Sequence, residues 1–136
     1  MTSEKRPYLF EFKKIGDSSI GFISITEKQD LPFNIDRVYW TYFTPNDVIR
    51  GNHAHKDLSQ IIIAVSGQIV VETEDRYGEK KAFTLNKPNQ GLFVPPFCWR
   101  TLQFSHSAVL LCLASSVFTE DDYFRSYDEF KKAIQK

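Results

Sequence analysis

Cysteine is scarce in this chain, since its 136 residues include only Cys98 and Cys112. Two cysteines are too few for the disulfide framework of a small secreted domain, and their spacing is not the C-x-x-C of a zinc site. An excess of one charge is also lacking, because 17 lysines and arginines balance 17 aspartates and glutamates. Nucleic acids and anionic membranes attract a basic surface, so the composition predicts neither as a partner.

Long apolar runs are missing as well. The two longest, near residues 61–71 and 108–117, are interrupted by Ser, Gly or Gln and are too short to span a bilayer. The first ten residues lack the apolar core of a secretory signal peptide, so we expect a cytoplasmic protein. The length, with no linker-like or repetitive stretch, predicts a single domain over residues 1–136.

Aromatic residues, by contrast, are abundant, with 12 Phe, 6 Tyr and 2 Trp, which fits a β-rich fold or a ligand pocket. Short β-type segments bounded by turn residues recur at 20–25, 38–43, 61–65, 68–72, 81–85, 91–94, 100–104 and 109–114. Strands of this number and length predict an all-β sandwich or barrel. Near the C-terminus, Thr119 is a predicted N-cap and aromatic residues follow at helical spacing, so we expect a short helix there.

Two of the three histidines, His53 and His55, are separated by a single residue. On a strand, such a pair points both imidazoles to one face, which suits either a metal site or proton transfer without a metal. The histidine pair, Gln60 and Gly67, followed by PPFCWR at residues 95–100, resembles the two sequence motifs of the cupin superfamily. This resemblance implies a jelly-roll fold, also called a double-stranded β-helix.

Two departures from the cupin motifs argue against a bound metal. Metal-binding cupins supply three histidines and a glutamate, whereas this chain has Gln60 at the glutamate position and Arg100 at the third histidine position. A neutral amide is a weak ligand, and a guanidinium cannot ligate. Two imidazoles are too few for a stable site, so we predict no metal ligands and no cofactor. The remaining histidine, His106, is predicted to lie in a turn.

Four further segments resemble a narrower family, the sugar-nucleotide 3,4-ketoisomerases, which are WxcM-like cupins of bacterial deoxyaminosugar pathways. They are RVYW at 37–40, RGNHAHKDLSQ at 50–60, GLFVPPFCW at 91–99 and DDYFRSYDEF at 121–130. The resemblance implies an isomerase that converts dTDP-4-keto-6-deoxyglucose to a 3-keto sugar without metal or redox cofactor, for lipopolysaccharide (O-antigen) sugars. It also implies a homodimer whose N-terminal strands cross to the partner, consistent with the alternation of Tyr8, Phe10 and Phe12 with charged residues.

The same resemblance implies roles for individual residues. His53 matches the base that removes a proton from C3, and His55 is either a second proton shuttle or a supporting residue. Tyr39 either donates to the enediolate oxygen or orients the imidazole. Arg50 either stabilises negative charge on the diphosphate or enediolate, or is an exposed arginine in a salt bridge. Arg100 is expected to lie near the sugar and bind it.

Arg100 also bears on the configuration of the product at C4. Members of the family with arginine at this position tend toward the gluco (quinovose-type) product, and members with histidine toward the galacto (fucose-type) product, so we expect the former. Ile20 departs from the arginine that some members carry in an early R-G-x-L segment. Two alternatives stay open: a cupin that binds sugar nucleotides without catalysis, and an epimerase, which returns the proton to the carbon that lost it.

Overall fold

The structure, a computed structural model, describes residues 4–135 and consists mainly of short strands. The strands are β1 (Tyr8–Glu11), β2 (Lys13–Asp17), β3 (Gly21–Ile25), β4 (Arg37–Thr41), β5 (Ile49–His55), β6 (Gln60–Ser66), β7 (Ile69–Glu74), β8 (Lys80–Leu85), β9 (Gln90–Val94), β10 (Trp99–Phe104), β11 (Val109–Ala114) and β12 (Tyr123–Phe124). The helical elements are the 3₁₀ turns η1 (Lys28–Asp30) and η2 (Glu120–Asp122) and the helix α1 (Tyr127–Ile134). The eight segments predicted as strands are confirmed, with ends that shift by at most two residues.

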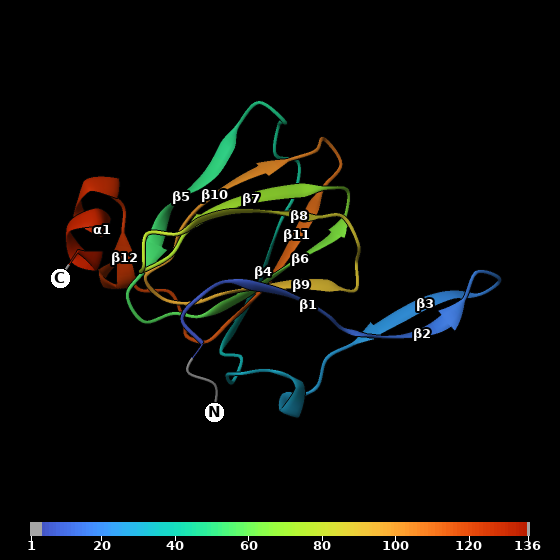
Figure 1. Cartoon of the computed structure of the whole chain (residues 1–136). Coiled ribbons are helices and arrows are strands. Elements are labelled where there is room, and N and C mark those ends of the chain that lie inside the picture. Colours follow the sequence, from blue (N-terminus) through green and yellow to red (C-terminus); the bar gives the residue numbers. More distant parts are fainter. Residues whose placement is uncertain (1–3, 136) are drawn as a thin grey trace.

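Ten strands form two antiparallel sheets that face each other across the core (Figure 1). One sheet has the order β1-β9-β6-β11-β4 and the other β12-β5-β10-β7-β8. Alternate residues point inward, so Ile62 and Ala64 of β6 and Leu110 and Cys112 of β11 lie in the main hydrophobic cluster between the sheets. The predicted all-β cupin fold with a short C-terminal helix is confirmed, although the sheets do not close into a continuous barrel.

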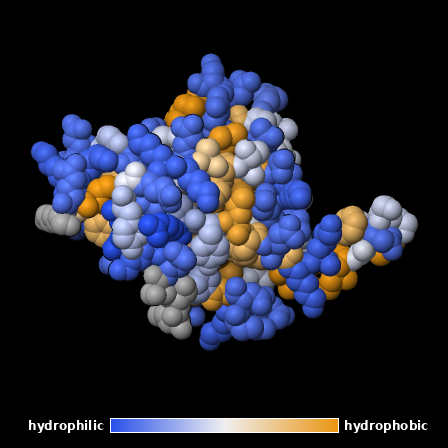
Figure 2. All heavy atoms as spheres, in the orientation of Figure 1, coloured by the Kyte–Doolittle hydropathy of each residue, from blue (hydrophilic) through white to orange (hydrophobic). Residues whose placement is uncertain are grey.

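The remaining strands, β2 and β3, form a hairpin that projects from the body (Figure 1). Its apolar side chains Ile15, Phe22 and Ile23 are exposed, and Ile20 in its turn is 81% exposed. Figure 2 shows apolar side chains on this hairpin and in a band across the adjoining face of the body. Exposed apolar surface of this kind marks interaction sites in soluble proteins.

The C-terminal segment differs from the sequence prediction. Thr119 precedes only the turn η2, and its side chain forms no capping hydrogen bond. The helix begins eight residues later, after Ser126, whose hydroxyl accepts from the backbone N–H of Glu129 at 3.3 Å. The cause is β12, because pairing of Tyr123 with His55 requires extended backbone where the aromatic spacing predicted helix.

Two smaller expectations can also be compared with residues 4–135. His106 lies in the turn between β10 and β11, as predicted. No helix within the described range is long and apolar enough to cross a membrane. Residues 1–3 and 136 of the predicted single domain lie outside the described residues.

Candidate active site

The two histidines lie on β5, next to a β-bulge that sets their orientation. His53 is opposite Arg100 of β10, but the next pair along the ladder is Gly51 with Thr101, so Asn52 is an extra residue. Gly51 and Asn52 both have positive φ, +87° and +57°. A side chain at Gly51 would meet the Arg100 carbonyl oxygen at 2.9 Å, so only glycine fits without a shift.

The bulge also determines where Arg50 points. Arg50 is opposite Leu102, whose side chain is buried between the sheets, and residues paired across a ladder share a face. The extra residue therefore places Arg50 on the face that carries His53, despite the odd spacing. Arg50 is exposed, and within residues 4–135 its guanidinium forms neither an ion pair nor a hydrogen bond. It is thus available to a ligand at the edge of the site.

His53 is partly buried and has one ring nitrogen engaged. Its Nδ1 lies 3.0 Å from the carbonyl oxygen of Gly51. A carbonyl only accepts, so Nδ1 carries the proton and Nε2 keeps its lone pair. Burial, followed by the Arg100 cation, lowers the pKa of His53 to about 3. The imidazole is therefore neutral near pH 7 and can accept a proton at Nε2.

His55 is buried, with 1% of its surface exposed, and is held by a carboxylate from the C-terminal segment. Its Nδ1 lies 2.8 Å from Oδ2 of Asp122, and Oδ1 of Asp122 accepts from the backbone N–H of Asp57 at 2.7 Å. Nδ1 therefore donates to Asp122, and Nε2 is buried with no partner among the described residues. Burial and the Arg100 cation lower the pKa of His55 to about 2.

Aromatic rings enclose the two imidazoles. The ring centroids of His53 and His55 are 4.9 Å apart, edge to face, and Tyr123 of β12 lies 5.1 Å from His53 and 4.4 Å from His55. The Arg125 guanidinium stacks over Tyr123 at 3.9 Å and pairs with Glu120 at 2.8 Å. The C-terminal segment thus closes one side of the site.

Arg100 is buried beside the histidines, with 1% of its surface exposed. Its Nε and Nη2 donate to the Cys98 carbonyl at 3.2 and 3.0 Å, and its Nη1 donates to Oε1 of Gln60. Within the described part of the chain no carboxylate forms an ion pair with it. Burial lowers its pKa, but a guanidinium keeps its charge in proteins. The structure therefore places Arg100 beside the histidines, where its field reaches them and three of its five N–H groups are already bonded within the protein.

Gln60 connects Arg100 to Tyr39. The Gln60 side chain is 2% exposed, and its Nε2 donates to the Tyr39 hydroxyl at 3.0 Å. Burial raises the pKa of Tyr39, so the phenol stays protonated. The five predicted site residues thus lie on β4, β5 and β10, which the fold brings to the space between the sheets.

Three contributions were not predicted from the sequence: Asp122, the aromatic contact of Tyr123, and the link through Gln60. The DDYFRSYDEF segment contains Asp122 and Tyr123, so the resemblance already pointed to this region without giving the residues a role. Among residues 4–135, no group of three or more His, Cys, Asp or Glu side chains is arranged to hold a metal ion.

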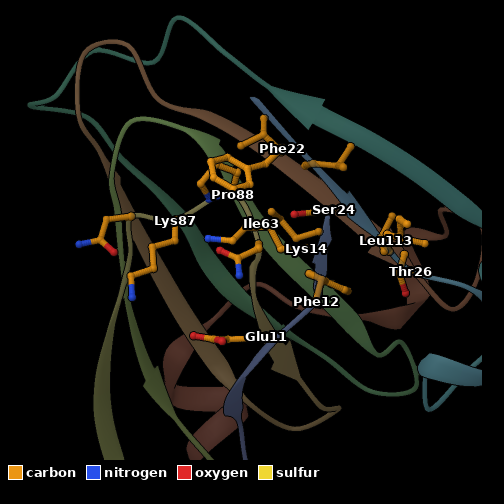
Figure 3. Close-up of a pocket in the computed structure, with 15 residues that line it drawn as sticks. Glu11, Phe12, Lys14, Phe22, Ser24, Thr26, Ile63, Lys87, Pro88 and Leu113 are labelled. Carbon is orange, nitrogen blue, oxygen red and sulfur yellow. The ribbon is translucent and has the colours of Figure 1, made fainter. Parts of the chain in front are cut away.

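A second hollow lies away from the histidines. It is a groove of about 870 Å³ between the hairpin and the outer face of the β6–β11 sheet (Figure 3). Ile63 and Val65 line it, whereas Gln60 and Ile62 point to the opposite face of β6. Phe12, Phe22 and Leu113 line the groove together with charged side chains, and neither histidine of β5 is among its lining residues.

Two facing antiparallel sheets with paired histidines at the inner face of one of them define a cupin. Within that class, the chain belongs to the FdtA family, described as WxcM-like, C-terminal, whose profile matches residues 5–135.

Individual relatives resemble the chain over nearly its whole length. It is 40% identical over 129 residues to the TDP-4-oxo-6-deoxy-alpha-D-glucose-3,4-oxoisomerase of Aneurinibacillus thermoaerophilus, covering 94% of this chain and 92% of that protein. QdtA, a sugar 3,4-ketoisomerase of Thermoanaerobacterium thermosaccharolyticum solved with TDP, is 36% identical, with a TM-score of 0.90 over 96% of this chain and 95% of that one. The WlaRB TDP-quinovose 3,4-ketoisomerase of Campylobacter jejuni is 34% identical, with a TM-score of 0.87 over 95% and 99%.

Proposed function

We propose that this protein is a TDP-sugar 3,4-ketoisomerase that acts on dTDP-4-keto-6-deoxyglucose. The observation that carries the proposal is the pair of neutral imidazoles, each with its Nδ1 engaged and its Nε2 free to accept a proton. The names of the relatives support the reaction class, and the complex of QdtA with TDP supports the nucleotide.

The chemistry needs proton transfers alone. The C4 ketone acidifies the C3 proton, which His53 removes through Nε2, leaving an enediolate shared by C3, C4 and their oxygens. A proton is delivered to C4, the C3 hydroxyl loses its proton and the C4 oxygen gains one, so the carbonyl has moved with no net change in composition. His55 is the second group able to hold a proton, and Tyr39 donates to an enediolate oxygen.

Arg50 and the product configuration complete the proposal. Arg50 is exposed at the edge of the site and suits the diphosphate or the sugar oxygens. We favour the gluco product because Arg100, and no titratable imidazole, follows the tryptophan of PPFCWR. The quinovose-type activity in the name of WlaRB agrees with this choice. The 3-keto product would then be consumed by an aminotransferase in deoxyaminosugar synthesis.

The decisive experiment is incubation with dTDP-4-keto-6-deoxyglucose in deuterium oxide, followed by NMR. A 3-keto product with deuterium at C4 and gluco configuration is expected. Deuterium at C3 with the 4-keto group retained would instead identify an epimerase. TDP binding with no turnover would identify a non-catalytic binding protein. His53→Asn is expected to abolish turnover while TDP still binds, and retained activity would remove His53 from the role of base.

We also propose a homodimer in which each hairpin packs on a second copy of the chain. The hairpin exposes Phe22 and Ile23, β4 ends its sheet with Trp40 60% exposed, and the groove of Figure 3 offers an apolar surface. The resemblance puts the Ile20 position near the sugar, yet Figure 1 shows the hairpin at the opposite end of the molecule from β12. A partner's site is the one that Ile20 could approach.

The mass in solution tests the dimer. Light scattering is expected to give twice the chain mass for the wild type and the chain mass for Phe22→Glu. Tyr77→Glu, which puts the same charge in place of an exposed aromatic ring away from the hairpin, should leave the dimer intact. A monomeric wild type would contradict the proposal.

A further inference from the structure

We propose that Gln60 is a positioning residue that makes Tyr39 a directed hydrogen-bond donor to the enediolate, with Arg100 fixing the direction. This inference rests on the proposed isomerase reaction and adds to it a residue that contacts no substrate.

The direction of the hydrogen bonds follows from Arg100. A guanidinium has donors and no acceptor, so the group of Gln60 that faces its Nη1 must be the carbonyl oxygen. The amide nitrogen of Gln60 is then the group that faces Tyr39, and it donates to the phenol oxygen at 3.0 Å. Since that oxygen accepts from Gln60, the phenolic hydrogen is left for another acceptor.

Turning the amide is not an alternative. A flip would set the Gln60 NH₂ against the Arg100 guanidinium, and two donors would face each other in a buried space. The position of Gln60 is also fixed, because it pairs with Val94 of β9 and Ala114 of β11 in the middle of its sheet. A free phenol can act as donor or acceptor, but this arrangement selects the donor.

The phenolic hydrogen has no strong acceptor waiting for it inside the protein. Apart from Gln60, the neighbouring polar group that acts on the Tyr39 hydroxyl is the thiol of Cys112, the residue opposite Tyr39 in the β4–β11 ladder. Burial raises the pKa of Cys112 to about 11, so its sulfur is neutral and a weak acceptor. An enediolate oxygen is a far stronger acceptor and would displace it.

The positive charge of Arg100 strengthens the Tyr39 hydroxyl as a hydrogen-bond donor. Arg100 is buried without a carboxylate partner in residues 4–135, which is costly unless another charge offsets it. Its hydrogen bond polarises the Gln60 amide, and the amide in turn polarises the phenol, because hydrogen bonds in a chain strengthen one another. The negative charge that develops on the enediolate is the missing counterpart.

A double-mutant cycle between Gln60 and Tyr39 tests the inference. Gln60→Met keeps the length of the side chain and removes both hydrogen bonds. We expect kcat to fall by roughly 10- to 100-fold, with KM changed less than about threefold, because the contact acts on the transition state. In a Tyr39→Phe background the same change should cost less than about threefold, since the group through which Gln60 acts is gone.

Equal losses in both backgrounds would overturn the inference, and so would a loss confined to KM. Gln103→Met is the matched control, because Gln103 is exposed on β10 and its side-chain amide donates to the Asn46 carbonyl, away from the site. The kcat of this variant should stay at the wild-type value. TDP affinity and the thermal midpoint establish that each variant is folded.

If Gln60→Met does not fold, Gln60→Glu answers the same question in the same two backgrounds. A carboxylate there still pairs with Arg100 but accepts the phenolic hydrogen, so the same dependence on Tyr39 is expected. The two proposals fail differently. A wild type without turnover would reject the isomerase and this inference with it, whereas an active wild type with an additive cycle would reject the role of Gln60 alone.

Discussion

Replacing Asp122 with asparagine tests the role of His55 with little change of shape. Oδ1 of Asp122 accepts from the backbone N–H of Asp57, so asparagine must keep its carbonyl oxygen there. Its NH₂ group then faces Nδ1 of His55, where the carboxylate accepted at 2.8 Å. An NH₂ group donates, so Nδ1 has to accept, and the ring proton moves to Nε2. His55 would lose the lone pair that faces the site.

The expected loss follows from the contribution of one acid–base group. General acid–base catalysis supplies about 10²- to 10⁴-fold, so Asp122→Asn should lower kcat by that order if His55 carries a proton in the reaction. The lost charge-assisted hydrogen bond should also cost about 1–3 kcal/mol of unfolding free energy. TDP affinity should hold, because the change lies behind the imidazole.

The assay is single-turnover NMR with dTDP-4-keto-6-deoxyglucose, together with chemical denaturation of the same samples. Asp121→Asn is the control, because Asp121 is the exposed neighbour and makes the same change in charge. A folded Asp122→Asn enzyme whose kcat stays within threefold of the wild type would refute the reasoning and leave His55 a supporting residue.

Four further outcomes are expected. Burial and Arg100 lower the pKa of His53 to about 3 and that of His55 to about 2, so kcat/KM should stay level from pH 8 down to about pH 5. A fall in kcat/KM with its midpoint above pH 6 would contradict neutral imidazole bases. The unfolded histidines titrate near 6.5, so stability to denaturant should be complete above that pH and fall below it, by up to about 1.4 kcal/mol per pH unit for each histidine. Gly51→Ala should lower both kcat and the thermal midpoint, whereas Gly78→Ala, with a similar φ of +81° but open space around it, should lower only the midpoint, and by less. Glu74→Gln should cost about 1–3 kcal/mol of unfolding free energy, because buried Glu74 accepts from Tyr127 at 2.6 Å and Lys131 at 2.5 Å and so anchors α1; an unchanged denaturation curve would speak against that anchor.

Local patterns were enough to predict most of the sheet structure. Short β-type segments and the turn residues between them predicted eight strands, and the H-x-H spacing correctly predicted two imidazoles on one face of β5. These features depend on neighbours within a few residues, which a sequence displays directly.

Features that depend on distant partners were not visible in the sequence. Asp122 is 67 positions from His55, and nothing local marks it as the group that holds the imidazole. The aromatic spacing after Thr119 predicted a helix, but Tyr123 pairs with β5 instead, because long-range strand pairing overrides a local helix preference. The bulge at Asn52 reversed the face of Arg50, because one extra residue changes the register. The bond from Arg100 to Gln60, 40 positions away, likewise depends on a distant strand, and the contact of Arg100 with the sugar stays a prediction.

The two kinds of contact that Arg100 makes with the site have different consequences for catalysis. Its field reaches the histidines and the place where an enediolate would form, so it lowers the basicity of the imidazoles as well as the energy of the anion. The transfer of a proton from C3 to the imidazole becomes more favourable only if the anion is stabilised more than the basicity of the imidazole is lowered. A field that acts on both groups alike changes this balance little. A hydrogen bond acts only on the atom at its end. The hydrogen bonds from Arg100 to Gln60 and from Gln60 to Tyr39 therefore strengthen a donor that stabilises the enediolate alone, although the same arginine charge weakens the base.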